Sequence, residues 1–143
     1  MLDAPDVYRS HYMRGMWKFE QRQMIEGERE LLIAMSLYKE DPHLYFDLGQ
    51  QYLNANRYRA AATLFRRSLE RDSTFTMGRG RLAVALAELN QWPEAHRQAL
   101  IALSQTIRPA PTVLAVLRLT SQEMRRERER RAGARPTIPT PRD

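Results

Sequence analysis

Apolar residues recur three and four positions apart along most of this 143-residue chain, which is the period of an amphipathic helix. The periodic stretches are separated by clusters of Pro, Asp, Asn and Ser, which favour turns and helix ends. The pattern predicts seven helices and an all-α fold class. The expected helices cover about residues 3–23, 26–39, 42–55, 57–71, 75–89, 92–106 and 111–131.

Residues at the breaks indicate where the helices begin and end. Asp3 and Asp41 have the short carboxylate of a typical N-cap, and a proline follows each of them closely, in the first turn of the expected helix. The Asp-Ser-Thr segment at 72–74 is expected to supply the next cap. Three prolines in the last ten residues favour an extended chain, so residues 132–143 are expected to form a Pro- and Arg-rich tail.

One motif in the middle of the chain recurs on both sides of it. It reads Tyr45-x-x-Leu48-Gly49-x-x-Tyr52, followed by Ala61-x-x-x-Phe65. A shift of about 34 residues brings further small and large residues into the same phase. The small residues, expected where paired helices approach each other, are Gly15, Gly49 and Ala83, and Gly27, Ala61 and Ala95. The large residues, expected to fill the start of each second helix, are Met24, Tyr58 and Trp92.

This spacing resembles the tetratricopeptide repeat, a helix-turn-helix unit of about 34 residues, with Tyr45 in place of the usual Trp. The resemblance implies a right-handed solenoid in which each hairpin buries its apolar side against the next one. His11 and Arg79 depart from the pattern at the first aromatic position, and Ser73 replaces the closing proline. The implied domain, at about residues 1–131, consists of repeats at about 8–41, 42–75 and 76–109 and a capping helix at about 111–131.

The resemblance also implies a groove, lined by the first helix of each repeat, that binds a segment of a partner. The predicted lining is apolar and tapers from large to small residues, which suits an amphipathic helix or an extended apolar segment. It does not match the Lys/Asn clamp for acidic C-terminal peptides. An equally weighted alternative is that the strip is core or is covered by the chain itself. The lining residues are Tyr12, Met16, Phe19, Phe46, Gln50, Leu53, Gly80, Val84, Ala87, Leu114 and Arg118.

The net charge of +6 comes from arginines in the second half of the chain. Glutamates alternate with the arginines after Arg118, which favours a solvated, salt-bridged helix. Contact with RNA or anionic lipid is the alternative. No aromatic residue is interleaved with these arginines, so base stacking is not expected and nucleic acid is the less favoured partner. The candidate basic patch consists of Arg125, Arg126, Arg128, Arg130, Arg131 and Arg135.

The remaining composition argues against an enzyme. The three histidines, His11, His43 and His96, fall in different repeats without metal-ligand or triad spacing, and the chain has no cysteine and no Gly-rich phosphate loop. We therefore expect no catalytic residue, metal or cofactor. The expected function is a non-catalytic protein-interaction module or assembly subunit that docks a partner segment in the groove, with the tail as a second contact.

Location and assembly are less directly indicated. The chain shows neither a signal peptide nor an apolar run long enough to cross a membrane, so a cytoplasmic protein is expected. Attachment to a larger assembly, including one at a membrane, is an open alternative. Val7, Tyr8 and Trp17 are expected to be bare at the N-terminal end, which would favour association there.

Overall fold

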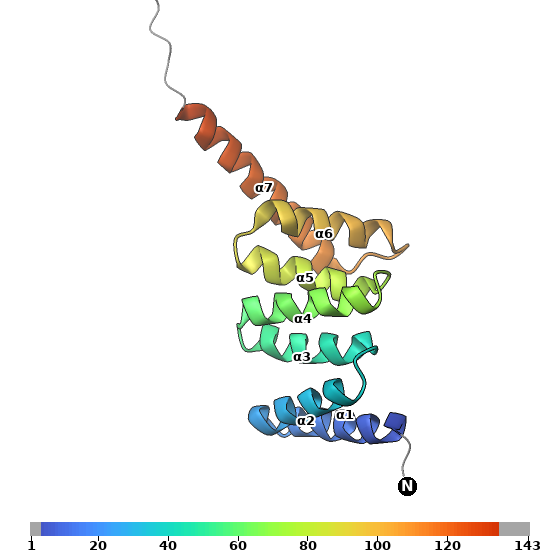
Figure 1. Cartoon of the computed structure of the whole chain (residues 1–143). Coiled ribbons are helices and arrows are strands. Elements are labelled where there is room, and N and C mark those ends of the chain that lie inside the picture. Colours follow the sequence, from blue (N-terminus) through green and yellow to red (C-terminus); the bar gives the residue numbers. More distant parts are fainter. Residues whose placement is uncertain (1–3, 135–143) are drawn as a thin grey trace, which may run out of the picture.

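The computed structural model describes residues 4–134, which form helices and connecting turns and contain no strand (Figure 1). The all-α fold class is confirmed, and the helix ends lie within a few residues of the predicted ones. Asp3, the expected first N-cap, and residues 135–143 of the expected tail lie outside the described residues. The helices are α1 (Ala4–Glu20), α2 (Met24–Leu37), α3 (Pro42–Asn54), α4 (Tyr58–Arg71), α5 (Thr76–Glu88), α6 (Trp92–Ser104) and α7 (Pro111–Gly133).

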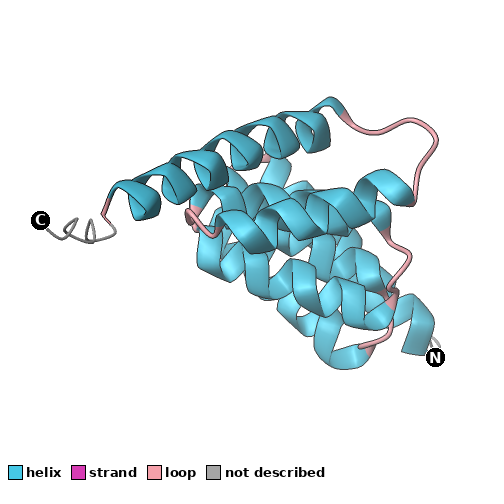
Figure 2. Ribbon diagram, turned by 90° about the horizontal axis from the view of Figure 1, so that it is seen from above, coloured by secondary structure: helices cyan, strands magenta, loops and turns pink. Residues whose placement is uncertain are grey.

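The helices pair into three hairpins that stack on one another. α1 pairs with α2, α3 with α4 and α5 with α6, and successive hairpins form layers (Figure 1). α7 has no second helix and packs against α5 and α6. Seen from above, α7 runs along one edge of the molecule beside the other helices, and its C-terminal part extends past them (Figure 2). Its place is therefore that of a capping helix.

The turns within the three hairpins share one backbone conformation. Arg22, Asn56 and Asn90 have φ angles of 61°, 60° and 59° and follow one another at the repeat spacing. In each turn the next backbone N–H donates to the carbonyl oxygen five residues earlier, as in a Schellman motif. These bonds are Gln23 N to Lys18 O (2.9 Å), Arg57 N to Tyr52 O (2.8 Å) and Gln91 N to Leu86 O (2.9 Å). The backbone thus confirms the phase that the side chains predict.

The two aspartates expected to cap helices behave differently. Asp41 is the N-cap of α3, as predicted, and its Oδ1 accepts a hydrogen bond from the backbone N–H of His43 at 3.0 Å. Asp72 instead ends α4, and its Oδ1 accepts from the backbone N–H and the hydroxyl of Thr74. Phe75 is the N-cap of α5 and supplies no side-chain bond. The 72–74 segment therefore forms its own turn and does not cap α5.

Glycine allows close contact of paired helices, as predicted. A Cβ atom at Gly49 of α3 would lie 2.8 Å from Cε1 of Phe65 in α4. At Gly15 of α1 it would collide with the Leu31 side chain of α2. Phe65 and Leu31 are fully buried, so neither can move aside cheaply. The two glycines consequently set the spacing within their hairpins.

The core has two parts. The larger one joins the second and third repeats to α7 and includes Phe65 and Leu82, with many buried alanines around them. The other joins the first and second repeats and includes Leu31 and Leu44. The two clusters follow each other along the stack rather than gathering at one centre, and the partly buried Tyr52 packs against both.

Tyrosine hydroxyls add polar contacts between the first two repeats. Tyr12 Oη of α1 donates to Asp47 Oδ2 of α3 at 2.5 Å, and Tyr52 Oη of α3 donates to Glu28 of α2. Burial raises the pKa of Asp47. Burial, as the larger cause, and the hydrogen bond to Glu28 raise the pKa of Tyr52 to about 12, and burial also raises the pKa of Tyr12. Both tyrosines therefore stay neutral donors over the physiological pH range.

One pair of positions shows how the repeats differ. The pair is His11 and Glu30 in the first hairpin, Tyr45 and Leu64 in the second, and Arg79 and Gln98 in the third. His11 Nδ1 lies 2.6 Å from Glu30 Oε2, and Arg14 lies 3.5 Å from the same oxygen. The corresponding residues of the second hairpin are buried and apolar or aromatic. The first and third hairpins thus have polar pairs, with Arg79 donating to Gln98 at 2.7 Å in the third, where the second hairpin has core.

The large residues of the first hairpin only partly match expectation. Tyr8 is buried, with its ring centroid 4.7 Å from that of Tyr38, so the expectation that it is bare is wrong. Trp17 is 53% exposed, as expected. Met24 is 40% exposed and does not fill the start of α2, whereas Trp92 packs against the core at the start of α6.

Candidate partner-binding face

The first helices of the hairpins and α7 form what we call the first-helix face. α3 contacts α5, α5 contacts α7, and the Tyr12–Asp47 hydrogen bond joins α1 to α3. All eleven residues predicted to line the groove are on these helices; Phe19, Phe46, Gly80 and Ala87 are buried, and the other seven are partly or fully exposed. The eleven are Tyr12, Met16 and Phe19 on α1, Phe46, Gln50 and Leu53 on α3, Gly80, Val84 and Ala87 on α5, and Leu114 and Arg118 on α7.

Phe19 and Phe46 belong to the core, which corrects their assignment to an open groove. Each is 8% exposed. The ring of Phe46 lies 5.8 Å from that of Phe65 and 5.3 Å from that of Phe75, between α3 and the two helices that follow. Phe19 packs over Gly27 of α2, which leaves no room for a Cβ atom. Phe19 therefore packs toward α2, and Phe46 packs toward α4 and the start of α5, rather than toward the open side of the face.

Gln50 is the most distinctive polar group on the face. Its Nε2 donates to Asn54 Oδ1 at 2.8 Å. Its Oε1 is buried and accepts no hydrogen bond from any described residue. Leu53 on the same helix and Val84 on α5 are partly exposed. An unsatisfied buried acceptor of this kind costs free energy, and a bound segment could reach it only if the Gln50 side chain changed its rotamer.

Tyr12 is held in place by its hydrogen bond to Asp47. Burial, and then the bond to Asp47, raises the pKa of Tyr12 well above its ordinary value. Its hydroxyl is therefore occupied, and its ring edge is the part available to a partner. Met16, one turn further along α1, is partly exposed and packs against the core of the first two repeats. This end of the face offers apolar contact rather than charge.

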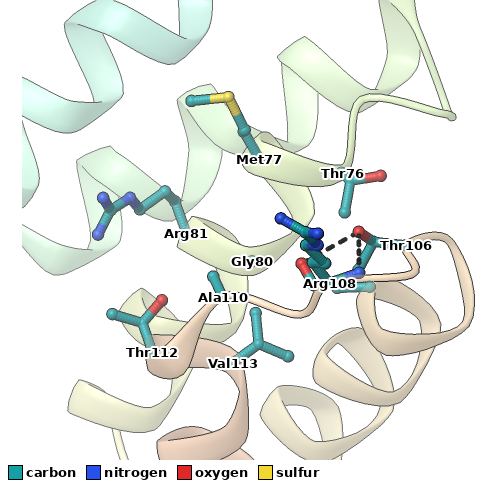
Figure 3. Close-up of a pocket in the computed structure, with 10 residues that line it drawn as sticks. Thr76, Met77, Gly80, Arg81, Thr106, Arg108, Ala110, Thr112 and Val113 are labelled. Carbon is teal, nitrogen blue, oxygen red and sulfur yellow. Dashed lines mark hydrogen bonds between the residues drawn. The ribbon is translucent and has the colours of Figure 1, made fainter.

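A cavity of about 310 Å³ lies at the other end of the face, between α5, the end of α6 and the start of α7 (Figure 3). Gly80 of α5 and Val113 of α7 meet there, and Arg108 from the α6–α7 connection reaches in beside Thr76. Arg81 borders the cavity and extends away from Arg108 (Figure 3). Gly80 was predicted to lie on this face, but the residues that line the cavity give no periodic pattern from which the cavity could be predicted. The decrease in side-chain size along the predicted lining, from Phe19 and Phe46 to Gly80, was the feature of the sequence that could have indicated it.

The basic patch is partly neutralised within α7. Arg126 pairs with Glu123 and Arg131 with Glu127, each at 2.6 Å. Glu127 does not pair with Arg130 in the described residues, and Arg130 Nε donates instead to the backbone oxygen of Arg126. Arg118, Arg125 and Arg128 are exposed and have no carboxylate partner among residues 4–134. Arg135 lies outside the described residues. Two ion pairs match the predicted salt-bridged helix.

The histidines do not come together. His11 contacts Glu30, His43 contacts Asp41, and His96 Nδ1 lies 2.8 Å from the Thr120 hydroxyl. Within the described part of the chain, no three His, Cys, Asp or Glu side chains gather as metal ligands would. No helix between residues 4 and 134 is both long and apolar enough to span a bilayer.

Comparison with solved structures places the fold. No family model matches the chain, and no curated protein matches its sequence significantly. The first TPR domain of Spaghetti (RPAP3), bound to an HSP90 peptide with the sequence SRMEEVD, is similar in structure, with a TM-score of 0.78 at 17% identity. The match covers 87% of this chain and 97% of that one.

Two further structures agree with this result. The Sgt2 TPR domain from Aspergillus fumigatus has a TM-score of 0.75 at 13% identity, covering 95% of this chain and 89% of that one. MamA of AMB-1 has a TM-score of 0.74 at 23% identity, covering 85% of this chain and 66% of that one. The seven helices, their pairing and these similarities lead to one conclusion: the chain has the tetratricopeptide-repeat fold, as its landmark spacing predicts.

Proposed function

We propose that this protein is a non-catalytic interaction module that binds a segment of a protein partner along the first-helix face. The observation that carries the proposal is the apolar surface that stays partly or fully exposed on this face, at Leu53 of α3, Val84 of α5 and Leu114 of α7. A bound segment would cover these side chains and remove their apolar surface from water.

The similar structures support this use of the fold. The Spaghetti domain is bound to an HSP90 peptide, and the TPR2B domain of yeast Sti1 is in a complex with pHsp70. In the first of these structures the fold binds a segment of another protein. The ligand of this chain is expected to differ, because the clamp positions hold Tyr12, Met16, Phe46 and Gln50 in place of Lys and Asn. The first-helix face is predominantly apolar with few charges.

A partner in a larger assembly, with residues 132–143 as a second contact, extends the same proposal. Binding through two contacts would raise the effective concentration of the partner at the face. Attachment to RNA or anionic lipid through α7 is the weaker alternative, because Glu123 and Glu127 neutralise two of its arginines. An affinity that does not change with salt would exclude that alternative.

Peptide selection followed by matched variants tests the proposal. Peptides from a random phage-displayed library would be selected on the full chain and their affinities measured by fluorescence polarisation. Val84→Glu on the first-helix face is expected to weaken them at least about tenfold, because it places a charge against an apolar ligand. Thr63→Glu is the matched control, because Thr63 is exposed in the middle of α4 on a second helix.

The two outcomes separate clearly. Peptides that lose affinity for Val84→Glu, keep it for Thr63→Glu and bind a protein of unchanged circular dichroism support the proposal. Peptides that bind both variants as tightly as the wild type would place the binding surface elsewhere. Failure to select any peptide from a library of high diversity would also count against it.

A further inference from the structure

The cavity at the α5–α7 end arises because one repeat lacks two aromatic residues that the preceding repeat has. In the second repeat, Phe46 projects from α3 and its ring lies 5.3 Å from that of Phe75. The corresponding residues in the third repeat are Gly80 and Pro109. Where the second repeat fills the space between consecutive first helices with aromatic rings, the third leaves about 310 Å³ empty.

The wall of the cavity is suited to an apolar group. Gly80, Ala102, Ala110 and Val113 line it, and Met77 stands at its edge. A Cβ atom built on Gly80 would meet only Cγ2 of Val113, at 3.1 Å, so the space beyond Gly80 is otherwise open. A volume of this size is at the lower end of ligand pockets and has room for one large aromatic side chain together with part of the adjoining chain.

The charge around the cavity has one sign. Arg81 and Arg108 both border it, and no Asp or Glu is among the residues that line it. Neither guanidinium has a carboxylate within ion-pair distance among residues 4–134, although Arg97, Arg126 and Arg131 each have one. Arg108 reaches into the cavity beside Thr76, and Arg81 extends from its opposite side (Figure 3). A ligand with a carboxylate next to its apolar group would complement both features.

We propose that the cavity takes an aromatic side chain of the bound partner segment, in the place that Phe46 occupies one repeat earlier, with an adjacent Asp or Glu of the segment paired to Arg108. This assignment rests on the proposed function, because it names the anchor of a segment lying along the same face. Arg81, on the far side of the cavity, is placed to meet a second acidic residue. The recognised feature is an aromatic residue followed by acid.

Capped dipeptides test the anchor directly on the full chain. The probe is N-acetyl-Phe-Glu-amide, with the Phe-Lys and Ala-Glu dipeptides as matched controls, followed by amide chemical shifts in nuclear magnetic resonance spectra. Phe-Glu is expected to shift the signals of Gly80, Thr106 and Ala110 at millimolar concentration. Phe-Lys is expected to bind about two- to fivefold more weakly, the size of an exposed ion pair. Ala-Glu is expected to lose at least about tenfold, because it leaves the cavity empty.

Two variants keep the test decisive. Gly80→Phe restores the pattern of the second repeat and is expected to fill the cavity from within, abolishing the response to Phe-Glu. Its Cβ atom would lie 3.1 Å from Cγ2 of Val113, which has to yield by a few tenths of an ångström. Arg108→Glu leaves the cavity open and is expected to reverse the preference, so that Phe-Lys binds more tightly than Phe-Glu. This exchange does not depend on whether Gly80→Phe folds.

The results distinguish the anchor from the face as a whole. Library peptides that no longer bind Val84→Glu but bind Gly80→Phe with full affinity would refute the proposal that an aromatic side chain occupies the cavity. They would leave the proposed function intact. Absence of any shift near Gly80 with Phe-Glu, or an unchanged preference in Arg108→Glu, would also refute the proposal for the cavity. Shifts confined to the cavity signals, with the preference reversed in Arg108→Glu, would support it.

Discussion

Replacing Arg22 by asparagine is expected to stabilise the protein by about 1 kcal/mol. Arg22 has a φ of 61°, in the left-handed region where residues other than glycine and asparagine lose about 1–2 kcal/mol. Asn56 and Asn90 occupy the same position in the other two hairpins. Arg22 is exposed and its side chain makes no hydrogen bond to a described residue, so the substitution removes no contact.

Urea unfolding followed by far-ultraviolet circular dichroism measures the effect. With an m value of about 1–3 kcal/mol/M, a gain of about 1 kcal/mol raises the urea midpoint by about 0.3–1 M. Asn90→Arg is the matched control and is expected to lose a similar amount. Asn56 is less suitable, because its Oδ1 accepts a hydrogen bond from Tyr58 at 3.0 Å. If both substitutions left the unfolding midpoint unchanged, the turns would not share the strained conformation described above.

Two further substitutions examine the core and the polar N-terminal end. Phe46→Ala is expected to cost about 3–5 kcal/mol in urea unfolding, because the ring packs against Phe65 and Phe75; a loss below about 1 kcal/mol would contradict its burial. The hydrogen bond from His11 lowers the pKa of Glu30, so its stabilising contribution is present above the unfolded pKa and is lost as the pH falls through the folded one. Glu30→Gln should therefore be less stable than the wild type near neutral pH and approach it in acid; a difference independent of pH would contradict this.

The repeat architecture could be predicted because several independent signals share one spacing. Gly15 and Gly49 mark close contacts between paired helices, and Asn56 and Asn90 mark the left-handed turn residues. Each of these signals can be read from the residue type at one position, because glycine permits a close approach of helices and asparagine tolerates a positive φ angle. The helix ends and the pairing of helices follow from such signals, so most of the fold could be predicted before the structure was known.

The exposure of residues at the edge of a helix face could not be predicted in the same way. Phe19 and Phe46 have the same phase as groove residues, yet their rings turn into the core because neighbouring helices leave space for them. Tyr8 was expected to be bare and instead stacks on Tyr38. In each case the outcome depends on which side chain arrives from another element, and spacing along one helix does not contain that information.

The cavity could be predicted only in part, because the sequence aligns the residues that differ between repeats but does not show that they lie side by side. The shift that aligns Gly80 with Phe46 also aligns Pro109 with Phe75. Only the structure shows that the two aromatic rings contact each other, so that replacing both opens one shared space. Two substitutions that look unrelated along the chain are adjacent in the fold.

Chemical-shift mapping with a library-selected peptide tests the central claim most directly. The amide signals of isotope-labelled full-length protein would be followed as the peptide is added. Binding along the first-helix face predicts the largest shifts at Gln50, Leu53 and Val84 on α3 and α5, with α4 and α6 little affected. Shifts concentrated instead around Thr63 on the outer side of α4, or on the arginines of α7, would contradict the assignment of this face as the binding surface.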